Sequence, residues 1–465
     1  MTALWRSVAG DSLQVSLIWR GVGFAMVLMS LRVRGSEPLD LWMPGLPPAY
    51  HAMLATGVLL ALLGPRLILL VASAAAWALI LYGYVARHQL DFIADEYLLF
   101  AALPLLGAAS ALVSAAEHRA AGQRWMLRMA TLVTLGFAAF HKSNSDFLDP
   151  ATSCATTLAA RLAERWSLPA PPLGPLGALV AEALAPVLLV LYPRVGACWL
   201  LVLAAGLGHV GPYAFNSLLA ALALAFLPPS SSECWRARPR RTLLLWLAGA
   251  AAAGTASANL HADTPDFLWW PYALFEAVLV GAAVLVLLAG GTGEPWWRPN
   301  LPPRPWLPGG PAHRALCIVA TAALLLQGVA PYLGLRYRLA FAMLSNLRVD
   351  DARWNSLVVP AWVHLRDDRH VHVLAILDDH GKPAKLGNRA AIVRPGVYSP
   401  QEFRRRLAES QLRRTPGTLH LRYRGQTQVI ANFARDPGLR AYAEDLPDER
   451  LLQDSLSLGP QRCVH

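Results

Sequence analysis

The sequence has little charge for its length. Only 15% of its 465 residues are charged and 55% are hydrophobic, whereas a soluble protein carries about a quarter charged residues. The shortage is uneven, because residues up to about Leu335 form long runs of Ala, Leu and Val, and the stretch after them is rich in Arg and Asp. This pattern argues against a wholly soluble chain and indicates an apolar region followed by a soluble one.

Cysteine and lysine are scarce as well. Five cysteines do not make a disulfide framework, although Cys154 and Cys463 both fall on the side that we predict to be external, so a bridge between them stays open. The net charge of +11 is spread over loops and the C-terminal region. Attraction to the anionic head groups of membrane lipids explains such a charge, and we expect no nucleic-acid partner.

Long apolar runs are abundant in the first 335 residues. Several reach the roughly 20 residues that a helix needs to cross the hydrocarbon core, and they lack the polar faces of helices in a soluble core. The sequence therefore predicts a polytopic α-helical membrane protein with about 8 to 11 spans and a small C-terminal α/β soluble domain. The clearest runs are Leu67–Val85, Tyr97–Ala116, Leu173–Tyr192, Tyr213–Leu227, Leu243–Asn259, Pro271–Gly290 and Ala315–Leu335, and weaker ones are Leu17–Leu31, Met53–Leu63, Trp125–His141 and Val195–Leu207.

The basic residues beside the spans predict the orientation, because cytoplasmic loops carry an excess of Lys and Arg. Cys234–Arg241 and Glu117–Arg128 are rich in Arg, and so is Trp296–Arg314, whereas His261–Phe267 has acidic residues and no basic one. This order places everything after Leu335 outside. We expect an integral protein of a bacterial-type inner or plasma membrane with an external C-terminal domain.

The predicted domains are a membrane domain over 1–335, a connecting segment over 336–352 and a small extracytoplasmic α/β domain over 353–465. The last shows strand patterns, a capping box that begins with Pro at the first helical position, and a hairpin. These are strands over Trp354–Leu365 and His370–Leu377, a helix from Ser399 to about Leu412, and a hairpin formed by Thr418–Tyr423 and Thr427–Phe433.

Two groups in the C-terminal domain invite a binding hypothesis. His370, His372 and His380 could be arranged as metal ligands, but no second cluster completes a site, so the polar face of an edge strand is favoured and no metal is expected. The run of Arg404, Arg405, Arg406, Arg413 and Arg414 is interpreted as a solvated helix face.

Ionisable groups within the apolar runs are the main candidates for function, since each costs about 3 kcal/mol at the centre of a span. Arg20, Lys142, Glu182 and His209 are in or at the ends of spans, and Asp95-Glu96 opens the span that begins at Tyr97. We expect Asp95 either to pair with Lys142 or to stay solvated.

Lys142 ends the Trp125–His141 run and is one of three lysines against 38 arginines. Lysine readily becomes neutral when buried, unlike arginine, and a neutral amine can act as a base. The alternative is an anchor whose stem lies in the apolar layer and whose charge reaches water.

Two longer motifs resemble those of a known family. The segment Phe140-His141-Lys142-Ser143-Asn144-Ser145-Asp146-Phe147-Leu148-Asp149-Pro150, followed by Ser153-Cys154, resembles the signature of HTTM proteins, the horizontally transferred transmembrane relatives of vitamin K-dependent gamma-carboxylase. Pro331–Leu335 and Phe341–Arg348 resemble the segment that joins that family's last span to its C-terminal region. Glu182 with Pro186, and His209, resemble an acidic-proline pair and a histidine of the family.

The resemblance implies that Lys142 is a catalytic base that deprotonates a reduced, vitamin K-like naphthoquinone. Reaction with oxygen would then give a strong base that removes a γ-proton from glutamate, after which the carbanion takes up carbon dioxide and the quinone leaves as its epoxide. An apolar cavity between spans would suit a lipid-soluble quinone, and a protein or peptide substrate would approach from outside. The pocket candidates are Asp95, Glu96, Asn144, Asp146, Glu182 and His209.

A second hypothesis is a non-catalytic relative, either a membrane scaffold or a lipid- or quinone-binding protein whose partner docks on the external domain. A transporter would show paired inverted repeats, and the sequence shows no such repeat.

Overall fold

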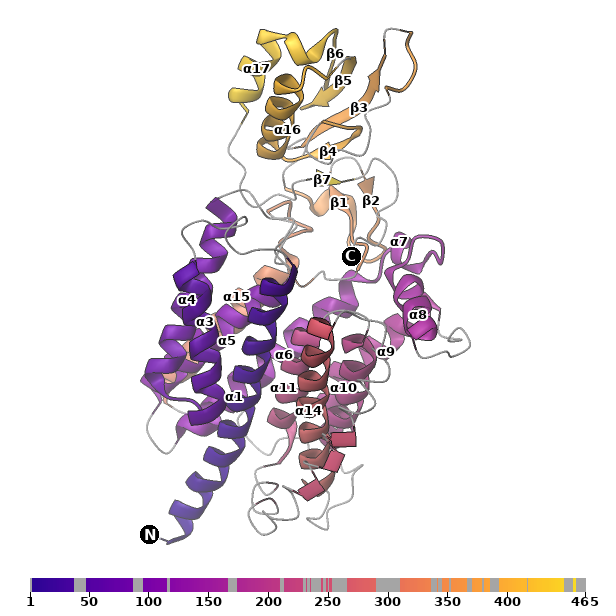
Figure 1. Ribbon diagram of the computed structural model, residues 1–465. Coiled ribbons are helices and arrows are strands. Elements are labelled where there is room, and N and C mark those ends of the chain that lie inside the picture. The colour runs from indigo at the N-terminus through magenta and orange to yellow at the C-terminus, as the bar shows by residue number, and fades with distance from the viewer. Residues whose placement is uncertain are drawn as a thin grey trace. The chain divides into compact units, whose positions relative to one another are not determined.

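The computed structural model in Figure 1 shows a mostly helical chain with a small antiparallel sheet. It describes residues 2–36, 47–86, 95–114, 118–165, 174–209, 213–228, 231, 235, 244–245, 248–249, 251–252, 266–289, 310–335, 341, 345–350, 353–365, 370–378, 380–384, 393–415, 417–446 and 455–456. The chain divides into two compact units. The helical unit comprises Met1–Ile80, Glu96–Phe140 and Thr157–Leu325, and the sheet unit comprises Leu81–Asp95, His141–Thr156 and Leu326–His465.

The helices occupy most of the first 329 residues. They are α1 (Thr2–Ser36), α3 (Pro47–Leu63), α4 (Leu67–Ala86), α5 (Asp95–Val113), α6 (Arg119–His141), α7 (Ser145–Leu148), α8 (Cys154–Arg165), α9 (Pro175–Leu191), α10 (Pro193–Gly208), α11 (Tyr213–Ala223) with a 3-10 turn at Leu224–Phe226, α14 (Asp266–Ala289) and α15 (Pro311–Val329). The sequence predicts helices over most of these ranges. A long apolar segment can pair its own backbone N–H and C=O groups only when it is a helix.

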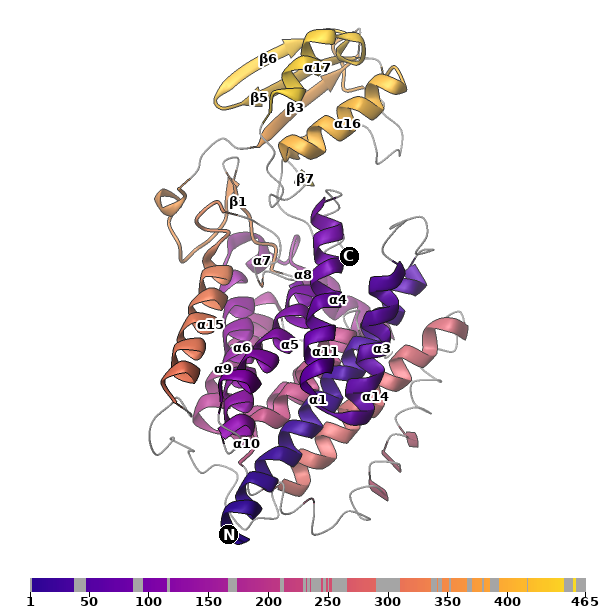
Figure 2. The same cartoon turned by 90° about the vertical axis from the view of Figure 1, so that its left-hand side faces the viewer.

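Close approach of backbones organises the helical unit. Helix α1 packs against α3, α11 and α14, and α10 packs against α9, α11 and α14 (Figure 2). A Cβ on Gly21 would lie 2.5 Å from the Cβ of Ala221, and a Cβ on Gly23 would lie 2.5 Å from the backbone nitrogen of Ala61. Small residues at such contacts let helices associate closely where side-chain burial alone cannot drive packing.

Two described helices are long and apolar enough to cross a membrane, namely Leu13–Ser30 within α1 and Pro311–Val329, and shorter apolar helices accompany them. The predicted run Ala315–Leu335 ends as a helix at Val329, because the chain then turns: Leu335 donates to the Ala330 carbonyl, and Gly334 has a φ of +65°. The predicted run Leu243–Asn259 lies largely outside the described residues, and so do the orientation segments Cys234–Arg241, His261–Phe267 and Trp296–Arg314. The remaining orientation segment, Glu117–Arg128, is not a loop but mostly the start of helix α6.

The sheet has five antiparallel strands in the order β6-β5-β3-β4-β7. Its elements are β3 (Val371–Leu377), β4 (Gly396–Tyr398), β5 (Thr418–Tyr423), β6 (Gln426–Ile430) and β7 (Ser455–Leu456), with helices α16 (Pro400–Leu412) and α17 (Pro437–Glu444), and 3-10 turns at Ala361–Val363 and Phe433–Arg435. A separate two-stranded ladder joins β1 (Val349–Asp350) to β2 (Arg353–Trp354).

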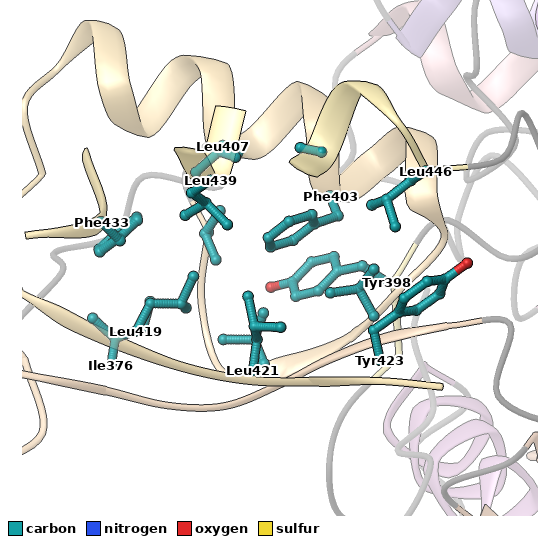
Figure 3. Packing of buried hydrophobic residues seen from close by; sticks show 14 residues of the cluster. Ile376, Tyr398, Phe403, Leu407, Leu419, Leu421, Tyr423, Phe433, Leu439 and Leu446 are labelled. Atoms are coloured by element: carbon teal, nitrogen blue, oxygen red, sulfur yellow. The ribbon is translucent and has the colours of Figure 1, made fainter. Parts of the chain in front are cut away.

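One face of the five-stranded sheet forms the core with α16 and α17 (Figure 3). Val371 and Val373 of β3 and Leu419 and Leu421 of β5 are fully buried against Phe403 of α16. The period-2 alternation of β5 produces this face. Ser399 caps α16 by accepting from the Glu402 amide, as the capping box predicts, and the predicted hairpin is present as β5 and β6.

Two predictions for this region are wrong. The predicted strand Trp354–Leu365 stops at Trp354, because the indole Nε1 donates to the Val359 carbonyl at 2.7 Å and folds the segment back on itself. Strand β3 is central rather than at an edge, and His370 and His372 are buried, with Arg422 donating toward His372 Nδ1 at 3.3 Å.

No group of three or more metal-ligating side chains occurs among the described residues. The arginine run on α16 is not uniformly solvated either. The buried Glu402 carboxylate binds both Arg405 and Arg406, and Arg406 lies 5.3 Å from the Tyr398 ring centroid.

Candidate functional site

Lys142 directly follows the last residue of α6 and is buried, with only 4% of its surface exposed. Its Nζ lies 5.9 Å from the centroid of the Phe147 ring. The chain reverses immediately after it, because Asn144 caps the short helix α7 by accepting from the Phe147 amide at 2.8 Å. The lysine is therefore held between the end of one helix and the first turn of another.

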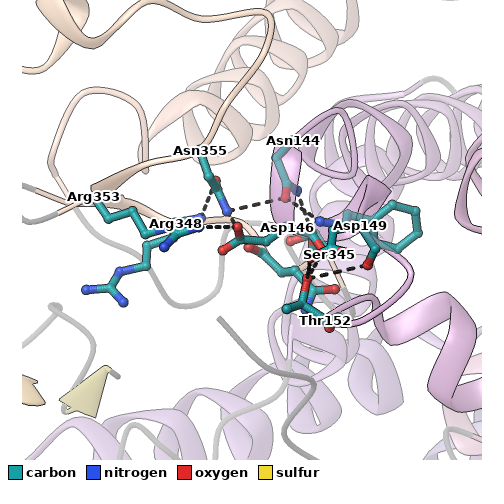
Figure 4. A network of polar contacts seen from close by, with 10 residues as sticks. Asn144, Asp146, Asp149, Thr152, Ser345, Arg348, Arg353 and Asn355 are labelled. Carbon is teal, nitrogen blue, oxygen red and sulfur yellow. Dashed lines mark hydrogen bonds and ion pairs between the residues drawn. The ribbon is translucent and has the colours of Figure 1, made fainter. Parts of the chain in front are cut away.

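The Asn144 side chain joins this turn to a segment about 200 residues away in the sequence. Its Nδ2 donates to the His141 carbonyl at 2.7 Å and to the Ser345 carbonyl at 2.6 Å (Figure 4). The backbone adds two bonds, from the Ser145 amide to the Asn355 carbonyl at 2.9 Å and from the Leu357 amide to the Ser143 carbonyl at 3.1 Å.

Two more asparagines complete the connection. Asn346 accepts from the Cys154 amide at 2.9 Å and donates to the Thr152 carbonyl at 3.0 Å. Asn355 accepts from the Arg348 amide at 2.8 Å and donates to the Asn346 carbonyl at 2.8 Å. Because buried backbone groups without partners are costly, these amides fix the two segments of the lysine turn against each other. We call residues 141–156 and 345–357 together the junction.

An ion pair lies at the edge of the junction. Arg353 donates to the Asp146 carboxylate at 2.6 Å; the carboxylate is buried, and the guanidinium is 32% exposed (Figure 4). Asp146 is thus engaged by a residue that follows the helices of the first 329 residues in the sequence.

An aromatic cluster adjoins Lys142 through its neighbour His141. The Nδ1 of His141 lies 2.9 Å from the Tyr332 hydroxyl, the Tyr332 ring lies 6.3 Å from that of Trp354, and Trp354 meets His364 edge to face at 5.8 Å. Burial raises the pKa of Tyr332 well above its usual range, although a hydrogen bond to Ser356 opposes the shift. The tyrosine therefore stays a neutral hydroxyl that can donate a hydrogen bond.

The structure brings together three of the predicted site residues, Lys142, Asn144 and Asp146, all in the sheet unit. Asp95 and Glu96 begin α5, but their side chains lie outside the described residues, so the pairing of Asp95 with Lys142 stays a prediction.

The other predicted candidates belong to the helical unit. Glu182 is half-buried on α9, and Arg20 donates to the Ala61 carbonyl at 3.2 Å. His209 is buried at the end of α10, with its Nε2 3.6 Å from the Glu276 carboxylate on α14. His209 and Glu276 therefore form a separate contact between two helices of the helical unit.

Sequence reasoning missed Glu276, Tyr332, Arg353 and Asn355 as individual residues. Glu276 had a usable signal, since it is an acidic residue inside the apolar run Pro271–Gly290. Tyr332 lies in a quoted motif but is not charged. Arg353 and Asn355 had no signal of this kind, because a single polar residue in a charged region is ordinary.

The described cysteines differ in state. Cys154 is disulfide-bonded, whereas Cys198 and Cys317 are free. Cys463 lies outside the described residues, so the pairing of Cys154 with Cys463 stays a prediction.

Comparison with protein-family models, with curated proteins and with solved structures gave no match.

Proposed function

We propose that this chain is a multi-span membrane protein in which Lys142 acts as the base of a quinol- and oxygen-dependent carboxylation of the kind that the HTTM resemblance implies. The observation that carries the proposal is the burial of Lys142 within a junction that six buried hydrogen bonds between asparagine side chains and backbone groups hold in place. A lysine that only anchors a helix end would reach water with its amine, and this one is 4% exposed.

The surface of the helices supports the membrane part of the proposal. Large apolar side chains are exposed on helix after helix, including Ile68 on α4, Leu112 on α5, Leu176 on α9 and Val319 on α15. Exposed apolar surface on this scale favours contact with lipid over contact with water. The disulfide at Cys154 supports an oxidising, external compartment for the junction.

The aromatic cluster that adjoins Lys142 through His141 would hold a flat aromatic cofactor. Trp354 and His364 are the partly exposed members of the aromatic cluster and offer ring surface, and the buried Tyr332 offers a neutral hydroxyl. A reduced naphthoquinone would supply the reducing equivalents and, with oxygen, the strength of base that removal of a glutamate γ-proton requires. The aromatic residues would hold the ring of the quinol, and the Lys142 amine would accept its first proton.

The roles of the remaining junction residues would be positional. Asn144 and Asn355 keep the turn closed, so the amine is offered from a fixed backbone and loses little freedom on reaction. The ion pair of Asp146 with Arg353 ties the same turn to strand β2. In our proposal neither these asparagines nor the ion pair accepts the proton.

The test compares variants at Lys142 with matched variants at Lys382, which is exposed on the turn after β3. Lys142→Ala should lower quinone epoxide formation by about a hundredfold or more, the usual worth of a positioned base. Lys142→Arg should fail as badly, because guanidinium stays protonated. Lys382→Ala and Lys382→Arg should match the parent at equal membrane levels. A Lys142→Arg protein as active as the parent would remove the proposal.

One feature favours a second candidate, a non-catalytic scaffold or lipid- or quinone-binding relative. The asparagines of the junction bind backbone groups of the chain itself, which is how a purely structural joint is built. Extraction and mass spectrometry of molecules that copurify in detergent separates the two. A copurifying quinone without epoxide formation by the parent protein would favour the second candidate.

A further inference from the structure

An apolar loop begins within the last two residues of the junction, in the sheet unit. It comprises Ser356–Leu365, between β2 and β3, and it contains no Asp, Glu, Lys or Arg. Four of its large apolar side chains face outward: Leu357 is 62% exposed, Val358 56%, Trp362 83% and Leu365 70%. An isolated exposed leucine is ordinary, but a contiguous exposed group of this kind marks a contact with another apolar surface.

The apolar loop is held in a fixed shape. Its Val359 amide donates to the Ser356 hydroxyl at 3.1 Å, and its Val359 carbonyl accepts from Trp354 Nε1 at 2.7 Å. A 3-10 turn over Ala361–Val363 is closed by the Val363 amide, which donates to the Pro360 carbonyl at 3.2 Å. These hydrogen bonds fix the backbone on both sides of Trp362, and the fixed backbone directs the Trp362 side chain outward.

The apolar loop is attached where two helices end. Its Leu357 amide donates to the carbonyl of Ser143, two residues after α6 ends at His141. At its other end the His364 ring packs on Gly334, five residues after α15 ends at Val329, so closely that a Cβ on Gly334 would lie 2.5 Å from His364 Nε2. If α6 and α15 cross the membrane, both attachments are at the level where the chain leaves the hydrocarbon.

We infer that the apolar loop Ser356–Leu365 inserts into the interfacial layer of the external leaflet, with Trp362 and Leu365 among the lipids. Tryptophan is enriched at that depth, where an apolar ring with one polar N–H is at home. The absence of formal charge over ten residues removes the main cost of leaving water. This inference rests on the membrane-spanning part of the proposed function and not on the role of Lys142.

Spin labels placed at three exposed sites test the inference in the full chain, in vesicles of phosphatidylethanolamine and phosphatidylglycerol. The variants are Trp362→Cys in the apolar loop, Val319→Cys in the middle of α15 and Leu412→Cys at the end of α16, each in a background without other label-reactive cysteines. The native side chains at all three positions are exposed, so each substitution is expected to leave the fold intact. The measured quantity is the rate at which the spin label collides with oxygen, which partitions into lipid, divided by the rate at which it collides with a water-soluble nickel complex.

We expect an oxygen-to-nickel ratio at Trp362→Cys that lies between the high value of Val319→Cys and the low value of Leu412→Cys. A ratio at Trp362→Cys equal to that of Leu412→Cys, with Val319→Cys still high, would overturn the inference and leave the membrane spans standing. A low ratio at Val319→Cys would instead overturn the spans. Spin–spin broadening at Trp362→Cys that disappears on dilution with unlabelled protein would show that a second copy, and not lipid, covers the loop.

Discussion

Both units bury large apolar side chains, but the helical unit also exposes many more of them than the sheet unit does. In the sheet unit Val371, Leu419 and Phe403 are turned inward and fully buried, whereas on the helices Leu79, Leu105 and Val319 are turned outward and exposed. The sheet is organised as a protein in water, with apolar residues inside because their removal from water stabilises the fold. The exposed leucines of the helices are consistent with the lipid environment proposed above, since lipid tails impose no such penalty on exposed leucine.

The largest effect that would sharpen this comparison is expected inside the sheet unit. Phe403→Ala empties the centre of its core and should destabilise it by about 3–5 kcal/mol. The measurement is the temperature at which the C-terminal region becomes susceptible to protease in the full chain. Leu412→Ala, at an exposed site on the same helix, is the control and should change stability by less than about 0.5 kcal/mol. Equal effects of both variants would break the assignment of an aqueous core to this unit.

A charge placed on the surface of α4 tests whether the exposed apolar side chains of the helices meet lipid. Leu79→Asp puts a carboxylate on the exposed face of α4, which should cost about 3 kcal/mol if that face meets lipid and almost nothing if it meets water. We expect less protein in the membrane fraction, while Leu412→Asp on α16 leaves the level unchanged. Normal membrane levels of Leu79→Asp would contradict the lipid-facing assignment of α4.

The junction offers a third kind of burial, in which the buried groups are polar. Asn355→Ala leaves the Arg348 amide and the Asn346 carbonyl without their side-chain partner, at a cost of about 1–3 kcal/mol for each buried group. The expected result is a lower temperature of protease susceptibility and faster reduction of the disulfide at Cys154, because Asn346 also holds the Cys154 amide. Gln426→Ala, at an exposed position of β6, is the control. An unchanged Asn355→Ala protein would show that the junction is not held by these bonds.

The smallest effect is a pH dependence confined to the sheet unit. Burial raises the pKa of Tyr442 to about 12, with the Tyr423 hydroxyl beside it adding to the shift and Arg424 opposing it. In the unfolded chain a tyrosine titrates near pH 10. Below that pH both states are protonated and nothing is lost. As pH rises from about 10 to 12, only the unfolded state gives up its proton, so the free energy of unfolding falls.

Tyr442→Phe removes this titration and should raise the alkaline midpoint of protease susceptibility slightly. Tyr192→Phe, in the helical unit, is the matched change and should leave the midpoint where it is. A shift of the same size in both variants would show that the alkaline transition does not begin in the sheet unit.

Prediction from sequence succeeded where one local signal decides the structure. The apolar runs predicted the ranges of α4, α5, α9 and α14 well, and the capping box at Ser399 predicted the start of α16. It failed at Trp354–Leu365, because a strand pattern cannot reveal that the Trp354 side chain will bond to a backbone carbonyl five residues later. It also misplaced β3 at an edge, since strand order depends on which partners fold beside it.

For the candidate site, sequence alone indicated which residue to propose as the base: a lysine at the end of an apolar run, among few lysines, in a motif that resembles one of the HTTM family. The burial of this lysine became visible only in the folded chain, where Ser345 and Asn355, which are distant in sequence, bond to the turn that contains it. The same holds for the apolar loop. Its composition is visible in the sequence, but its outward direction is set by hydrogen bonds to Ser143 and Trp354, and hydrogen bonds between distant residues exist only once the chain has folded.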